Sequence, residues 1–385
     1  MSSTQALQLT SKLIAILEGR AFSPLELPAL EEYSLYSQNA NFFHQEPLVS
    51  IMSPSGRLIT LKPDATLSVA QAYTGDATQK VYYTDQICRL NRQSGEFVLF
   101  EQFGAEIIGP YDPFHDLELV DLVLDCLSAL GNYVLDISHL GLVSALMEIP
   151  GLGALDKQAF MQALSTKSPH RISQLLSETN PSPDTGSGAS SCVGVGVGSG
   201  VGAGTGISAG LDTAALLQKV FLSANRLPDA LSLLDDLDIP QAKPAIEEIR
   251  LLADGLGERA YDINLDLSVV GDLDYYSGLA FRGYLIDVPS AVLTGGRYDK
   301  LMKKMGKPGS AVGFAINMSL LGNHSPQTAA DFITGRYTEK SRWSEILAWQ
   351  RDMISRGKTV RLIGPTETAP AGAVIINIDG DCNEH

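Results

Sequence analysis

The sequence contains few basic residues for its length. Among 385 residues, 28 are Lys or Arg and 44 are Asp or Glu, which gives a formal net charge of −16. Affinity for nucleic acids comes mainly from clustered Lys and Arg, and the chain contains no run of these residues. The composition therefore disfavours a partner held through its phosphate backbone. It favours a cytoplasmic protein that meets small molecules or other proteins.

Cysteine patterns and membrane segments are also lacking. No CxxC pair occurs, so we predict neither a zinc ribbon nor a disulfide framework from the four single cysteines, Cys88, Cys126, Cys192 and Cys382. The longest uncharged run, about 186–210, is too rich in Gly for a stable membrane span. Residues 1–20 are typical of an amphipathic helix and not of a signal peptide. We therefore expect no metal and no membrane partner.

The apolar patterns predict an α+β fold, with a mostly antiparallel sheet flanked by helices. Helical spacing marks 3–19 and also 117–131, which follows Asp116 and ends at Gly131. Strand-like runs rich in β-branched and aromatic residues occur at 48–61 (a hairpin), 81–90, 96–109, 133–140, 261–270, 279–287, 290–296 and 311–318.

We predict two domains. The first covers 1–322 and includes a helical insertion at about 142–257. Within this insertion, 186–210 cannot bury enough side chain to offset its ordering entropy, which predicts a flexible loop. The second, 325–385, carries one helix and two strands, as a small C-terminal α/β unit would.

Common catalytic and cofactor motifs are missing from the chain. It has no Gx4GK[ST], GxSxG or HExxH pattern and no Rossmann fingerprint, so we predict no catalytic residue and no cofactor. The six histidines are dispersed. A lone histidine such as His139 is more often a hydrogen-bonded structural group than a ligand.

Four short segments nevertheless stand out by their order. They are 61–66 (LKPDAT), 88–106 (CRLNR to EQFGAE), 272–278 (DLDYYSG), and 295–300 (GGRYDK) with 311–315 (AVGFA). Together with their spacing, they resemble the histidyl-tRNA synthetases, a class II aminoacyl-tRNA synthetase family. The resemblance covers roughly 5–322, and Pro28 is similar to the proline at that family's dimer interface.

The chain departs from that family where adenylate formation needs positive charge. Gly271 stands where the family has an arginine before the Leu-Asp-Tyr-Tyr run, and Ser319–Leu320 replaces a Glu-Arg pair. Glu96–Leu99 replaces basic residues of a loop, and the tail is too short for the family's anticodon-binding domain. Phosphoryl chemistry depends on fixed cations. These departures therefore disfavour an active synthetase and, with the acidic charge, a tRNA partner.

A synthetase-like chain with these losses resembles the ATP phosphoribosyltransferase regulatory subunits. That resemblance implies a non-catalytic subunit in the first step of L-histidine biosynthesis. It would assemble as a dimer within a hetero-octamer with the short catalytic subunit. It would activate that subunit and convey feedback inhibition by histidine, its allosteric ligand.

The resemblance also implies a histidine-binding site. The residues carried over are Asp64, Thr66, Arg89, Gln102, Glu106, Tyr275 and Tyr276. Asp64, Thr66 and Gln102 would hold the α-ammonium group, although Asp64 is one methylene shorter than the family's usual Glu. Glu106 and Tyr276 would contact the imidazole.

The remaining residues of these segments, and the function of the chain, allow more than one interpretation. Arg89 would face the carboxylate. Strand alternation allows only one of Tyr275 and Tyr276 to line the pocket. Gly295–Arg297 fits a tight turn at a strand end equally well. The polar set could also be a relic ion-pair network, and the chain an active histidyl-tRNA synthetase or a stand-alone histidine sensor.

Overall fold

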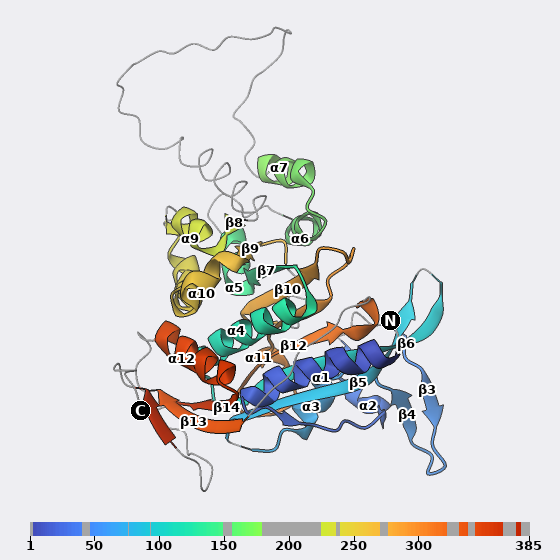
Figure 1. Cartoon of the computed structure of the whole chain (residues 1–385). Helices are drawn as coiled ribbons and strands as arrows, with labels where there is room; N and C mark the ends of the chain where they lie inside the picture. Colours follow the sequence, from blue (N-terminus) through green and yellow to red (C-terminus); the bar gives the residue numbers. More distant parts are fainter. Residues whose placement is uncertain are drawn as a thin grey trace, which may run out of the picture.

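A computed structural model gives the fold of the chain (Figure 1). The ranges that it describes are 3–40, 47–75, 77–92, 94–148, 156–178, 225–235, 239–269, 276–321, 331–337, 343–364 and 375–378. The Gly-rich tract at 186–210 lies outside them, and so do Gly271 and Tyr275. Within the described residues, no helix is long and apolar enough to cross a membrane.

A central sheet carries the fold, and its described part has nine strands. In spatial order these are β1 (Ser23–Pro24), β5 (Gln79–Asn91), β6 (Glu96–Gly109), β12 (Ser310–Asn317), β11 (Leu293–Arg297), β10 (Leu279–Leu285), β7 (Tyr133–His139), β9 (Ile263–Leu265) and β8 (Asn225–Arg226). Only β1–β5 and β7–β9 pair in parallel. The predicted α+β fold with a mostly antiparallel sheet is therefore confirmed.

Two long helices cover one face of this sheet. α1 (Ser3–Gly19) packs beside α4 (Pro113–Leu130), as Figure 1 shows. Helix α4 begins at Pro113, four residues before the predicted start at 117. Asp112, and not Asp116, is the N-cap, and its carboxylate accepts a hydrogen bond from the Phe114 amide at 2.9 Å. Pro113 in the first turn suits this start, because proline lacks the amide proton that a helix cannot use there.

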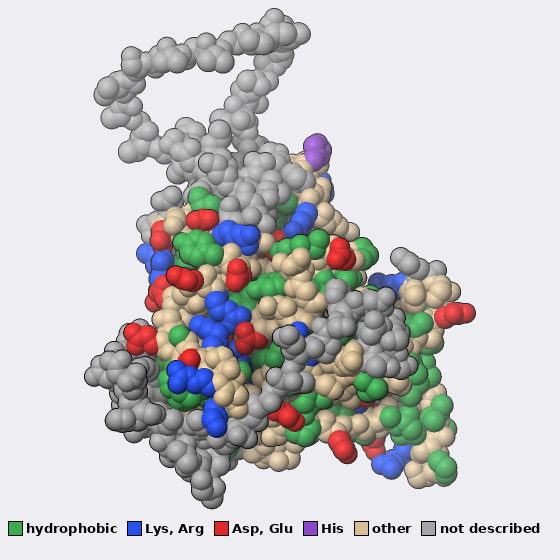
Figure 2. All heavy atoms as spheres, in the orientation of Figure 1, with side chains coloured by type: hydrophobic (Ala, Val, Ile, Leu, Met, Phe, Trp, Pro, Cys, Tyr) green, Lys and Arg blue, Asp and Glu red, His purple; other side chains and the backbone are tan. Residues whose placement is uncertain are grey.

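Shorter elements complete the first part of the chain. A small antiparallel sheet contains the predicted hairpin, with β2 (Leu30–Glu32), β4 (Leu58–Leu61) and β3 (Ser50–Met52) in that order. The short helices are α2 (Tyr33–Ser37), α3 (Thr66–Ala72), α11 (Asp299–Lys304) and η4 (Met318–Leu320). Apolar side chains gather over the β3–β4 hairpin at the lower right of the molecule (Figure 2), including the exposed Ile51 and Met52.

The described residues of the predicted insertion are mainly helical, apart from strand β8. The helices of the insertion are α5 (Leu140–Met147), α6 (Lys157–Ser165), α7 (Pro169–Glu178), α9 (Leu227–Asp235), η2 (Pro240–Ala242), α10 (Lys243–Leu256) and η3 (Gly257–Asp262). The tail contains α12 (Trp343–Ser355) and a parallel sheet of β14 (Lys358–Ile363), β13 (Asp331–Tyr337) and β15 (Ile375–Ile378). Strand β13 was not predicted. The division of the chain at 322–325 stays a prediction.

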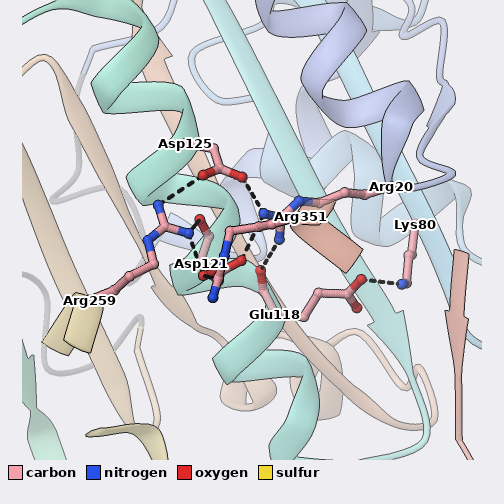
Figure 3. A network of polar contacts seen from close by, with 7 residues as sticks. All are labelled: Arg20, Lys80, Glu118, Asp121, Asp125, Arg259 and Arg351. Carbon is pink, nitrogen blue, oxygen red and sulfur yellow. Dashed lines mark hydrogen bonds and ion pairs between the residues drawn. The ribbon is translucent and has the colours of Figure 1, made fainter. Parts of the chain in front are cut away.

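A buried ion-pair network ties the tail to helix α4 (Figure 3). Asp121 of α4 is fully buried and receives three guanidinium groups, from Arg20, Arg259 and Arg351. Burial alone would raise the pKa of Asp121, but the three arginines outweigh burial and lower it. Because Arg351 belongs to α12 and Arg259 to η3, one carboxylate joins three separate elements to α4.

Candidate functional site

A cavity of about 360 Å³ lies on the sheet, walled by strands β6, β12, β11 and β10. It is polar at one end, where the loop before α3 and the strand β5 approach. The residues that line it are Pro63, Asp64, Thr66, Arg89, Phe100, Gln102, Glu106, Val269, Tyr276, Ala280, Phe281, Arg282, Ala291, Val292, Thr294, Gly295, Gly296, Tyr298, Gly313, Phe314, Ala315 and Asn317.

Six of the seven residues predicted for the site line this one cavity. They come from three separate parts of the sequence and are Asp64, Thr66, Arg89, Gln102, Glu106 and Tyr276. Tyr275, the seventh, falls outside the described residues. The sheet register contributes to the convergence, because Gln102 and Glu106 are four residues apart on β6 and therefore lie on the same face.

Glu106 is the most enclosed acid of the cavity. It is 2% exposed and accepts hydrogen bonds from the hydroxyl of Tyr298 at 2.9 Å and that of Thr66 at 3.4 Å. Burial raises its pKa to about 8, against an ordinary value of 4.5. At pH 7 the side chain is therefore mostly a neutral carboxylic acid that can donate a hydrogen bond to a ring nitrogen.

Space for the Glu106 side chain comes from glycine on the next strand. Gly313 is its cross-strand partner in β12, and a Cβ at Gly313 would lie 1.4 Å from Glu106 Oε2. Gly296 of β11 is the next residue in the same row, and a Cβ there would lie 2.7 Å from the ring of Tyr276. The two glycines therefore let a carboxyl and a phenol lie flat on the sheet.

Position 295–297 corrects one sequence interpretation. Gly295, Gly296 and Arg297 are paired on both sides within β11, with β10 and β12, and do not form a tight turn. Arg297 points away from the cavity to an ion pair with Asp116. The prediction for His139 is confirmed: its Nε2 lies 3.0 Å from Glu248 Oε2 in a structural contact.

Arg89 lies at the rim of the cavity with its guanidinium already engaged. Its Nε donates to the carbonyl of Pro63 at 2.8 Å, and its Nη2 lies 3.4 Å from Asp64 Oδ2. The side chain is 42% exposed and lies over the ring of Phe100, 5.8 Å from its centroid. Burial raises the pKa of Asp64, and Arg89 opposes this rise.

Several polar residues of the site were not predicted from the sequence, and Thr294 and Asn317 of the cavity lining are among them. Tyr298 holds Glu106, Tyr83 accepts a hydrogen bond from Gln102 Nε2 at 3.1 Å, and Arg282 lines the cavity from β10. Tyr298 lies within GGRYDK (295–300), one of the four segments that resemble the family, so this motif could have indicated it. Tyr83 and Arg282 belong to ordinary strand patterns, and only the register of the sheet reveals them.

The positions that disfavour adenylate formation are also visible. Leu320, where the related family has an arginine, packs against the hydrophobic core from η4. The Ser319 hydroxyl accepts a hydrogen bond from the Glu101 amide at 3.2 Å. Phe97, Val98 and Leu99, in the segment depleted of basic residues, belong to strand β6 and are exposed apolar side chains. These described positions offer no cation to a phosphate group.

Comparison with known proteins decides the family. The family description "Histidyl-tRNA synthetase" matches residues 1–321. The chain belongs to the histidyl-tRNA synthetase family. Among curated relatives, it is 25% identical over 328 residues to the ATP phosphoribosyltransferase regulatory subunit of Acetivibrio thermocellus, covering 81% of this chain and 71% of that one. The corresponding subunit of Oceanobacillus iheyensis is 26% identical over 360 residues, with coverage of 90% and 82%.

Solved structures of this family share the fold. An ATP phosphoribosyltransferase regulatory subunit/histidyl-tRNA synthetase from Bacillus halodurans matches with a TM-score of 0.64 and 19% identity, covering 98% of this chain and 95% of that one. A histidyl-tRNA synthetase from Nostoc sp. matches with a TM-score of 0.63 and 16% identity, covering 96% and 84%. The resemblance and the class II fold expected from the motifs are thus confirmed.

Proposed function

We propose that this member of the histidyl-tRNA synthetase family is the non-catalytic regulatory subunit of ATP phosphoribosyltransferase, in L-histidine biosynthesis. The activity would reside in a short catalytic partner, which this cytoplasmic chain would activate and subject to feedback inhibition by histidine. Its curated relatives carry that name. A structure of the ATP phosphoribosyl transferase complex from Thermotoga maritima has the same fold, with a TM-score of 0.57 and 20% identity, covering 81% of this chain and 97% of that one.

The observation that carries the proposal is a polar cavity suited to an amino acid, together with neutral residues at positions where the family has cations for the ATP phosphates. Asp64, Thr66 and Gln102 would receive an α-ammonium group at one end of the cavity. Glu106 and Tyr276 would contact an imidazole at the floor. Glu106 is already fixed by Tyr298 and Thr66, so the ring site would be organised before the ligand arrives.

Self-association is part of the proposal. The hairpin of β3 and β4 presents apolar side chains to solvent, with Ile51 53% and Met52 66% exposed. Pro28, the residue similar to the family's interface proline, lies nearby, and its carbonyl accepts a hydrogen bond from Lys62 at 2.8 Å. Buried Lys62 also pairs with Asp85, which fixes this segment on β5. We infer that this surface joins two copies of the chain within the hetero-octamer.

The test is the formation of phosphoribosyl-ATP by the short catalytic subunit, measured alone, with this chain, and with this chain plus L-histidine. We expect this chain to change the rate, histidine to lower the rate of the mixture, and the two proteins to co-elute in size-exclusion chromatography. An unchanged rate without co-elution would contradict the subunit assignment and leave a stand-alone histidine sensor.

An active synthetase is the competing function, and a separate measurement decides it. Histidine-dependent exchange between ATP and pyrophosphate reports adenylate formation directly. We expect none from the purified chain, since the partly buried Leu320 packs against the core at the position where the family has a phosphate-binding arginine. Measurable exchange would overturn this expectation.

A further inference from the structure

Arg282 is a cation of the cavity that the proposed ligand contacts do not yet use. It extends from β10, is half-buried, and lines the cavity beside Thr294 and Ala280. Within the described residues, its guanidinium makes no hydrogen bond or ion pair. Its cross-strand neighbour Asp136 accepts a hydrogen bond from Asn264 Nδ2 at 2.9 Å, and the charge of Arg282 also acts on this carboxylate and opposes the rise of its pKa on burial. A guanidinium without such partners can bind an incoming anion.

The sheet register directs Arg282 toward the ligand. Arg282 pairs with Thr294 of β11, and Thr294 pairs with Ala315 of β12. Cross-strand partners share a face, so these side chains form one row across the cavity floor. Since Thr294 and Ala315 are small, the long Arg282 side chain has room to lie across them toward Gly104, which lies between Gln102 and Glu106 on the same face of β6. The adjacent row is Ala280, Gly296, Gly313 and Glu106, where the imidazole would lie.

The charges of the cavity favour Arg282 over Arg89 as the anion-binding group. Arg89 is paired with Asp64 and anchored to the carbonyl of Pro63, so its charge is already balanced. Glu106 is mostly neutral at pH 7 because burial raises its pKa to about 8. Among the described groups that line the cavity, Arg282 is therefore the cation that holds no hydrogen bond or ion pair, and Asp136 acts on its charge without contacting it.

We propose that Arg282 binds the α-carboxylate of the amino-acid ligand and makes the pocket selective for a free amino acid. The assignment rests on the proposed histidine pocket and deepens it. A guanidinium can hold a carboxylate through two parallel hydrogen bonds. A ligand with the same ring and amine but no carboxylate, such as histamine, would leave Arg282 without its partner.

Isothermal titration of L-histidine and of histamine into the full chain tests this role. We expect wild type to prefer histidine. Arg282→Gln should weaken histidine binding about 10- to 100-fold and leave histamine binding nearly unchanged, so the preference disappears. Arg282→Lys keeps the charge without the planar fork and should give an intermediate result.

Two controls make the result specific. Arg57→Gln removes an exposed arginine of the β3–β4 hairpin, paired with Glu32, and should leave both affinities unchanged. Arg89→Gln separates the two cavity arginines and should preserve the preference for histidine. Circular dichroism checks the fold of each variant, and Arg282→Met, which keeps the apolar stem, replaces the Gln variant if that one does not fold.

The outcomes distinguish this assignment from the proposed function. If wild type binds histidine and the Arg282 variants keep its full preference over histamine, the role of Arg282 is wrong while the histidine pocket stands. If only Arg89→Gln loses the preference for histidine, Arg89 and not Arg282 binds the carboxylate of the ligand. If wild type does not bind histidine, the proposed pocket fails, and the assignment fails with it.

Discussion

Glu106 shows how burial sets the protonation state of one side chain in the cavity. The folded pKa of about 8 lies above the ordinary value of 4.5, because burial disfavours the charged form. The folded chain therefore holds this proton more tightly than the unfolded chain. Its contribution to stability is fully present below about pH 4.5 and is lost as the pH rises through about 8.

Glu106→Gln should remove this pH dependence, since an amide of similar shape does not titrate. We expect the free energy of unfolding of wild type, relative to the variant, to fall between pH 5 and pH 8. The slope should approach about 1.4 kcal/mol per pH unit at its steepest. Urea denaturation at several pH values measures it. Parallel curves for the two proteins would show that Glu106 keeps an ordinary pKa.

Gly313 shows the steric side of the same arrangement. A Cβ at this position would lie 1.4 Å from Glu106 Oε2, so Gly313→Ala should displace the carboxyl and fill the ring site. We expect a loss of about 1–3 kcal/mol of stability, with histidine binding abolished. Gly19→Ala is the control, because a Cβ at Gly19 would lie 3.9 Å from the nearest side-chain atoms, which belong to Ile354. Equal effects of both substitutions would contradict the steric argument.

Elements with strong local signals were predicted well from the sequence, and those set by tertiary context were not. The long strands β5 and β6 follow from β-branched and aromatic runs joined by a polar turn. Strand β13 carries a Thr-Gly pair, and parallel pairing with β14 and β15 stabilises it instead of local propensity. Gly295–Arg297 has turn composition, but flat packing of Tyr276 on the sheet requires glycine there.

The candidate site was predictable only as far as its motifs reached. Thr66, Gln102 and Glu106 lie in recognisable segments, and the structure brings them together. Arg282 and Tyr83 lie in strands whose side chains alternate between core and cavity, and the register of four strands decides which ones reach the ligand space. A pattern within one strand does not contain that information.

Helix α4 offers a prediction at the scale of elements. Asp121→Asn would leave Arg20, Arg259 and Arg351 without their shared carboxylate in a buried site. Arg20 and Arg259 would keep their pairs with the partly exposed Asp125, whereas Arg351 would lose its pair with Asp121. We expect a loss of about 3–5 kcal/mol, because one carboxylate would then remain for several buried positive charges. Chemical denaturation measures it. Glu32→Gln breaks the exposed pair with Arg57 and should cost about 0–1 kcal/mol; a similar cost for both would contradict the buried role.

At the scale of the whole molecule, the proposed function separates sensing from assembly. The cavity lies on the central sheet, whereas the apolar hairpin with Ile51 and Met52 belongs to the separate small sheet of β2, β4 and β3 (Figure 1). A ligand changes the activity of a partner only through a coupling free energy between two sites, typically about 1–3 kcal/mol. Substitutions inside the cavity should therefore alter the response to histidine without altering the complex.

Glu106→Ala and Asp64→Asn should each blunt inhibition by histidine in the mixture with the short catalytic subunit. We expect the histidine concentration for half-inhibition to rise about 5-fold or more, while the elution volume of the complex and its rate without histidine stay the same. Glu101→Gln is the matched control, because Glu101 is the neighbour of Gln102 on β6 but belongs to the opposite face. Unchanged inhibition in both cavity variants would place the histidine sensor outside this cavity, and loss of co-elution would show that sensing and assembly share these residues.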